Sequence, residues 1–240
     1  AGAPAVLEAF AWGLLGASSL LLGAVIGLVV DVPKRLLGLI MAFGAGTLIS
    51  AVAFELTEEA YREGGAGVVA LGLALGALAY FAGDVLIERR SASSGEDASA
   101  KGMLLGAILD GIPEPAVIGT TLIGGASIGV PVLAAVFIAN LPESLSAASG
   151  MRHATGGRAH KRGIWVVVVL VCGASSALGY ELLAGASADA VGLLQSFAAG
   201  AVLTMLADTM FPQAFKDGGK ATGLLTVLGF AAAYLLSTLS

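Results

Sequence analysis

Apolar residues occur in eight long stretches separated by short polar segments. Each stretch is close to the ~20 residues that a helix needs to cross a bilayer. The sequence therefore predicts an all-α integral membrane protein, with one polytopic domain over residues 1–240. The predicted spans are 5–30, 36–60, 66–87, 102–124, 129–150, 163–186, 190–212 and 221–239. The polar segments 89–101 and 151–162 are predicted to be flexible cytoplasmic loops.

Composition agrees with the membrane class. Hydrophobic residues make up 57% of the chain and charged residues only 12%, with a mean hydropathy of +0.92. A soluble domain carries about 25% charged residues, so this class is excluded. The 35 glycines lie mainly within apolar runs, where glycine lets helix backbones approach closely.

Basic residues are distributed unequally between the predicted loops. With eight spans, the odd-numbered loops hold all 12 Lys and Arg residues except Arg62. The positive-inside rule therefore places the odd loops in the cytoplasm and both termini outside, in an inner or plasma membrane.

Short echoes suggest an inverted repeat. Phe43-Gly-Ala-Gly46 in the second span resembles Phe197-Ala-Ala-Gly200 in the seventh, and the two spans run in opposite directions by the loop count. The predicted arrangement relates spans 1–3 to spans 6–8, around a central antiparallel pair formed by spans 4 and 5. Inverted repeats of this kind are typical of secondary transporters, whose binding site lies near the middle of the membrane.

Two proline–glutamate pairs interrupt apolar stretches. Asp110-Gly-Ile-Pro-Glu114 lies in the fourth span, and Asn140-Leu-Pro-Glu143 lies in the fifth. Asp110 and Glu114 are four residues apart and Asn140 and Glu143 are three apart, so each pair shares one helix face. Proline also leaves the carbonyl of the residue four positions earlier without its helical donor. Each motif therefore offers several oxygen atoms on one face.

Buried carboxylates need a counter-charge, and no Lys or Arg lies inside a predicted span. Protons, a bound cation or both in exchange must then supply the positive charge. Carboxylate, amide and backbone oxygens suit hard or borderline divalent cations. The predicted metal-binding residues are Asp110, Glu114, Asn140, Glu143 and, from the sixth span, Glu181. Three further deep acids are weaker candidates for lining a cation path: Glu55, Asp84 and Asp208.

These motifs resemble those of the ZIP (Zrt-/Irt-like) family of divalent metal transporters. Asp110-Gly-Ile-Pro-Glu-Pro115 looks like the family's His-Asn-x-Pro-Glu-Gly motif, and the segment Asn140–Glu143 is similar to its second Pro-Glu motif. The stretch Phe43–Glu55 is also ZIP-like, and the resemblance covers nearly the whole chain. Asp110 and Gly111 depart from the family pattern, because they stand where His and Asn are usual.

The resemblance implies an elevator-like transporter, with spans 1, 4, 5 and 6 moving against spans 2, 3, 7 and 8, and a homodimer as the expected assembly. It further implies that Glu181 helps to bind a second metal ion, whose site loses one ligand at Gly111. Because no imidazole remains in the motifs, the cargo preference shifts from Zn²⁺ toward Mn²⁺ or Fe²⁺, with Zn²⁺ and Cd²⁺ still candidates.

The sequence therefore predicts a transporter that carries a divalent metal ion (Zn, Mn, Fe or Cd) toward the cytoplasm. It predicts no enzymatic activity, no organic cofactor and no nucleic-acid partner; the expected partners are metal ions and the lipid bilayer. Three alternatives stay open: a proton-coupled carrier of a small organic solute, a metal-binding ZIP homologue with altered or lost transport, and an intramembrane aspartyl hydrolase. The hydrolase is disfavoured because the acids accompany prolines and lack a nucleophile–base pair.

Overall fold

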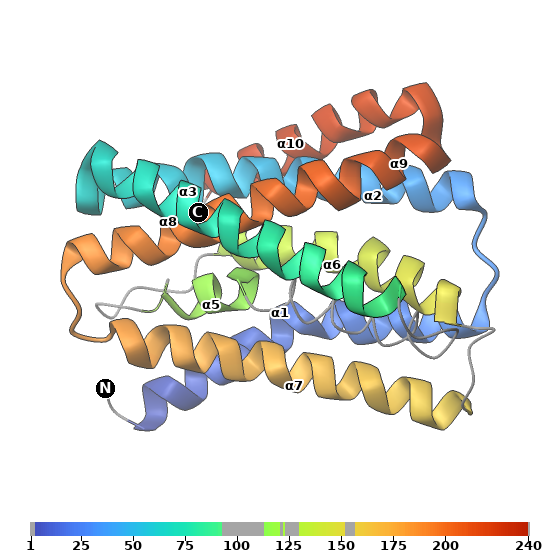
Figure 1. Ribbon diagram of the computed structural model, residues 1–240, viewed down its shortest axis with the longest axis horizontal. Coiled ribbons are helices and arrows are strands. Elements are labelled where there is room, and N and C mark those ends of the chain that lie inside the picture. The colour runs from blue at the N-terminus through green and yellow to red at the C-terminus, as the bar shows by residue number, and fades with distance from the viewer. Residues whose placement is uncertain (1–2, 93–112, 121, 123–129, 152–156, 240) are drawn as a thin grey trace.

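The computed structural model describes residues 3–92, 113–120, 122, 130–151 and 157–239, and these residues form a bundle of helices (Figure 1). The α-helices are α1 (Ala3–Val29), α2 (Lys34–Ala51), α3 (Glu58–Ala92), α5 (Pro113–Thr120), α6 (Val130–Gly150), α7 (Arg158–Leu183), α8 (Ala188–Met205), α9 (Phe211–Gly218) and α10 (Thr222–Leu239). Two π-helical segments, η1 (Val52–Thr57) and η4 (Leu206–Met210), and one 3₁₀ turn, η5 (Gly219–Ala221), connect them. No strand occurs in these residues.

Five apolar helical segments of the described chain are long enough to cross a membrane. They cover Ala3–Val29, Lys34–Ile87, Val130–Gly150, His160–Leu183 and Ala188–Thr238. Many large apolar side chains point outward; Leu182 is 73% exposed and Leu224 is 71% exposed. Such a surface would be unfavourable in water but fits the hydrocarbon core of a bilayer. The long apolar helices and the apolar surface are therefore those of a multi-pass membrane protein.

The two longest apolar segments each reverse direction at a glycine. Gly65 (φ 71°) interrupts the helix inside α3, and Gly219 (φ 67°) follows α9. Residues with a side chain rarely adopt a positive φ of this kind, which glycine tolerates without strain. Figure 1 shows the chain turning back at one end of the bundle between α2 and the rest of α3, and at the other end between α9 and α10.

The first half of the chain packs closely against the second half through two pairs of helices. Helix α3 packs against α8, and α10 packs against α2. A Cβ atom added at Gly76 of α3 would overlap the carbonyl oxygen of Phe197 in α8; one added at Gly229 of α10 would overlap that of Phe43 in α2. Phe43 and Phe197 are the first residues of the two similar tetrapeptides, so equivalent positions make equivalent contacts.

Both tetrapeptides lead into a π-helical segment. The segment η1 follows α2 and contains Glu55, whereas η4 follows α8 and contains Asp208. A π-helix inserts an extra residue into a turn and often marks a functional position. Each of the two π-helical segments therefore contains one acidic residue, Glu55 in η1 and Asp208 in η4.

The observed helices extend beyond several predicted spans. Helix α7 begins at Arg158 rather than at residue 163, so the end of the predicted loop 151–162 is helical. Helix α9 likewise occupies part of the polar segment before residue 221. The helices α7 and α9 therefore continue through charged residues that lie beyond the apolar stretches of the sequence. The predicted span 102–124 and the loop 89–101 lie mostly outside the described residues.

Candidate functional site

The second proline–glutamate motif lies within α6. Asn140 is only 3% exposed, Pro142 is fully buried and Glu143 is half-buried. Pro142 interrupts the helical hydrogen-bond pattern without ending the helix. One turn of this region is held by Ser144, whose Oγ donates to the carbonyl oxygens of Asn140 (2.8 Å) and Leu141 (3.1 Å).

Small residues on two neighbouring helices hold this motif in place. A Cβ atom added at Gly23 of α1 would overlap the Leu141 carbonyl oxygen and Ser144 Oγ. On another side, a Cβ atom added at Gly44 of α2 would lie 3.0 Å from the Cα atom of Ala139. The motif on α6 is therefore in backbone contact with α1 and α2, and Gly44 belongs to the first of the two similar tetrapeptides.

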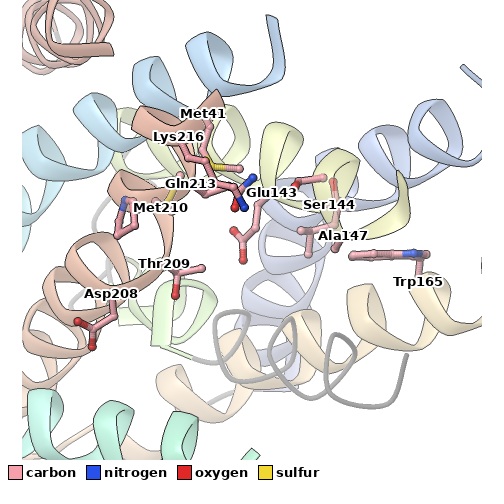
Figure 2. Close-up of a pocket in the computed structure, with 13 residues that line it drawn as sticks. Met41, Glu143, Ser144, Ala147, Trp165, Asp208, Thr209, Met210, Gln213 and Lys216 are labelled. Atoms are coloured by element: carbon pink, nitrogen blue, oxygen red, sulfur yellow. The ribbon is translucent and has the colours of Figure 1, made fainter. Parts of the chain in front are cut away.

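A cavity of about 460 Å³ opens beside Glu143 (Figure 2). Its wall combines residues from six elements, α1, α2, α6, α7, η4 and α9. The lining residues are Leu20, Met41, Glu143, Ser144, Ser146, Ala147, Trp165, Asp208, Thr209, Met210, Pro212, Gln213 and Lys216.

One wall of the cavity is a polar face of η4 and α9. Thr209, Pro212, Gln213 and Lys216 line it at a spacing of three and four residues, which is one face of a helix. Gln213 is oriented by Asp217, because its Nε2 donates to Asp217 Oδ2 at 2.5 Å. This bond leaves the amide oxygen of Gln213 as an acceptor at the cavity.

Figure 2 shows how the charged residues of the cavity are placed. The ends of Gln213 and Lys216 lie beside Glu143 in this view. The carboxylate of Asp208 points away from Glu143, although Asp208 lines the same cavity. Glu143, Gln213 and Lys216 therefore line the same cavity, and Asp208 points elsewhere in it.

The first proline–glutamate motif is described only in part. Asp110 lies outside the described residues, and Glu114 lies in α5 with its side chain outside them. Helix α5 packs closely on α7, since a Cβ atom added at Gly119 would overlap the carbonyl oxygen of Ser176. It also contacts α6, which carries the second motif.

Glu181 lies apart from Asn140 and Glu143. It is exposed on α7 and lines a different, shallow pocket against the start of α1, together with Ala3, Val6, Leu7, Phe10 and Ala177. Asn140 and Glu143 therefore lie one turn apart on α6, but neither Asn140 nor Glu181 lines the cavity beside Glu143.

The three deeper acids have different surroundings. Asp208 lines the cavity, whereas Asp84 is half-buried on α3. Glu55 lines a narrow crevice with no room for a water molecule, together with Ser50, Ala51, Pro131, Ala233 and Ser237. Asp208 of η4 thus lines a cavity that can hold water, whereas Glu55 of η1 lines a crevice that cannot.

The described donors suit a cation but do not complete a metal site. Within the described ranges, no group of three or more His, Cys, Asp or Glu side chains is placed to hold a metal ion. Glu143, Asn140 and Gln213 offer one carboxylate and two amide oxygens, the donor types of a hard cation. Asp110 and Glu114 would have to supply the remaining charge.

The sequence analysis missed Gln213 and Lys216. Both lie between the predicted spans 190–212 and 221–239, in a segment that the sequence predicts to be a loop. The signal that could have found them is the spacing of positions 209, 212, 213 and 216, which continues the helix past residue 212. No Lys or Arg lies inside a predicted span, yet Lys216 places a basic side chain at the cavity that Glu143 lines.

Comparison with protein-family models gives no match, and no curated protein matches the sequence.

Proposed function

We propose that the protein is a ZIP-like transporter that moves a divalent metal ion across the membrane toward the cytoplasm. Glu143 and Asn140 on α6, together with Asp110 and Glu114, bind the ion. Glu181 lines a different pocket, so it is not part of the proposed site beside Glu143 and would serve only a second cation position. Transport exposes the site alternately to the two sides, through an elevator-like shift of one group of helices against the other.

One observation carries this proposal: a half-buried glutamate on a proline-interrupted helix lines a cavity inside an apolar bundle. Ionisable residues at such positions are costly and usually mark an ion or proton pathway. The oxygen-only donor set on α6 and α9 favours a hard or borderline cation as the cargo.

The paired contacts support eight spans and an inverted repeat. The pairs α2–α10 and α8–α3 use equivalent glycines against equivalent phenylalanines, and each of α2 and α8 continues into a π-helical segment. The reversals at Gly65 and Gly219 divide the two longest apolar segments into two arms each. These features support a transporter whose two halves exchange roles during alternating access.

The cavity volume favours a second candidate, a proton-coupled carrier of a small organic solute. At about 460 Å³, the space is larger than a bare ion requires and falls within the range of small-molecule sites. Met41, Trp165 and Met210 give it an apolar wall. In this function, Glu143 would carry protons rather than bind a metal.

Uptake into proteoliposomes tests the proposal. Purified protein should load vesicles with at least one of Mn²⁺, Fe²⁺, Zn²⁺ and Cd²⁺, and these ions should compete with one another. Metal bound without uptake would indicate a homologue that has lost transport. Absence of both binding and uptake would reject the metal function and leave the solute carrier.

The proposed orientation predicts which face of the membrane each loop occupies. Cys172 is fully buried, so the native thiol should give little background labelling. A membrane-impermeant thiol reagent should label Ala186→Cys, between α7 and α8, from the outside. It should label Lys34→Cys, at the start of α2, only from the cytoplasmic side. Labelling of both positions from one side would contradict the eight-span arrangement.

A further inference from the structure

Lys216 is a cation built into the wall of the proposed binding cavity. It lies in the last turn of α9 and lines the cavity together with Glu143 and Asp208. Its side chain is exposed, and in the view of Figure 2 it extends toward the part of the cavity that Glu143 lines. Within the described part of the chain, its ammonium group makes no ion pair within 4.0 Å.

The backbone that carries Lys216 is firmly held. A Cβ atom added at Gly38 of α2 would lie 2.5 Å from the backbone nitrogen of Gly218, so α2 and α9 are in direct backbone contact. The helix ends at Gly219, whose N–H donates to the carbonyl oxygen of Phe215. The helix turn that carries Lys216 is therefore packed directly against α2.

The neighbouring polar groups leave Lys216 available to Glu143. Asp217, the adjacent acid, accepts a hydrogen bond from Gln213 instead. Asp208 points away from Glu143 in the cavity. When a metal ion leaves an acidic site, the remaining carboxylate charge is unfavourable in a weakly polar cavity, and a nearby ammonium group can offset it.

We propose that Lys216 is an internal competitor of the transported cation. Its charge repels a dication bound at Glu143 and replaces that dication after release. The residue thus lowers the affinity of the site and speeds release of the cation. This inference rests on the proposed function, because it requires a cation at Glu143.

Binding of Mn²⁺ to the purified full-length protein, measured by calorimetry in detergent, tests the inference. Lys216→Met keeps the length of the side chain and removes its charge, and it should tighten binding up to about fivefold, the size expected for the interaction of an exposed charge. Lys216→Arg should bind as the wild type does. Lys220→Met is the matched control, since Lys220 is exposed, as Lys216 is, but does not line the cavity.

Two further measurements separate competition from a structural role. In proteoliposomes, Lys216→Met should lower both the KM and the maximal rate of uptake, because tighter binding delays release. In a Glu143→Gln background, Lys216→Met should change the affinity less than in the wild type, because a double-mutant cycle measures the coupling between the two residues.

The possible failures are distinguishable. Wild-type binding that depends on Glu143, together with unchanged or weaker binding by Lys216→Met, overturns the role of Lys216 alone. Equal effects of Lys216→Met and Lys220→Met also overturn it, because the effect would then be one of overall charge. A wild-type protein that binds no divalent cation overturns both this inference and the proposed function.

Discussion

Glu143→Gln should abolish divalent-cation uptake and weaken cation binding by about 100-fold or more, the order expected when one member of a buried charge pair is neutralised. Glutamine keeps the shape of the side chain, so α6 should keep its contacts with α1 and α2. Glu143 is half-buried at the cavity, where water cannot fully compensate the lost charge. The measurements are calorimetric binding and uptake into proteoliposomes.

Glu181→Gln provides the matched control for this variant. Glu181 is an acid on a membrane helix as well, but it is exposed and lines a separate pocket near the start of α1. Its replacement should leave the cation affinity within about twofold of the wild type. This change is much smaller than a tenfold change in Kd, which corresponds to about 1.4 kcal/mol. Normal uptake by Glu143→Gln would reject the assignment of the site, and loss of binding by Glu181→Gln would return that residue to the ligand set.

Gly76→Ala and Gly229→Ala should each strongly destabilise the folded bundle. In either variant the new methyl group would overlap a backbone carbonyl oxygen, of Phe197 or of Phe43, which cannot move without its helix. Overpacking of this kind costs about 1–3 kcal/mol or more. Thermal unfolding in detergent should show a lower Tm for both variants, and the similar surroundings of the two glycines predict effects of similar size.

Gly67→Ala and Gly223→Ala lie on the same two helices and serve as controls. No neighbouring atom lies within 4 Å of a Cβ atom at either position. Alanine is favoured over glycine in a helix by about 1 kcal/mol, so these variants should be neutral or slightly more stable. If Gly76→Ala or Gly229→Ala were as stable as these controls, the close α3–α8 or α2–α10 contact would not exist in the membrane protein.

The helices at the two ends of the chain were predictable almost to the residue. The predicted spans 5–30 and 221–239 correspond to α1 (Ala3–Val29) and α10 (Thr222–Leu239). An unbroken apolar run and the thickness of a bilayer suffice to define such helices. The π-helical segments were not predictable, because they depend on how neighbouring helices fit together rather than on local composition.

The candidate site was predictable in part. Spacing placed Asn140 and Glu143 on one face of α6, but only packing decides that Asn140 is buried against other helices while Glu143 reaches a cavity. The depth of Glu181 in its span did not reveal that it faces outward, since the rotation of a helix is set by its neighbours. Lys216 was missed because a charge near the end of an apolar run resembles a loop residue.

The indole of Trp165 gives this protein an optical reporter of its own. Trp165 lines the cavity and is 2% exposed, and its Nε1–H has no hydrogen-bond partner among the described residues. Trp12 on α1 is the other tryptophan, so Trp12→Phe leaves a single emitter. In that variant, Mn²⁺ should shift the fluorescence maximum if it changes the water content of the cavity, because buried indole N–H groups seek a polar partner. The same shift should be absent in Trp12→Phe combined with Glu143→Gln, so the filling and emptying of the cavity could be followed in real time without an added label.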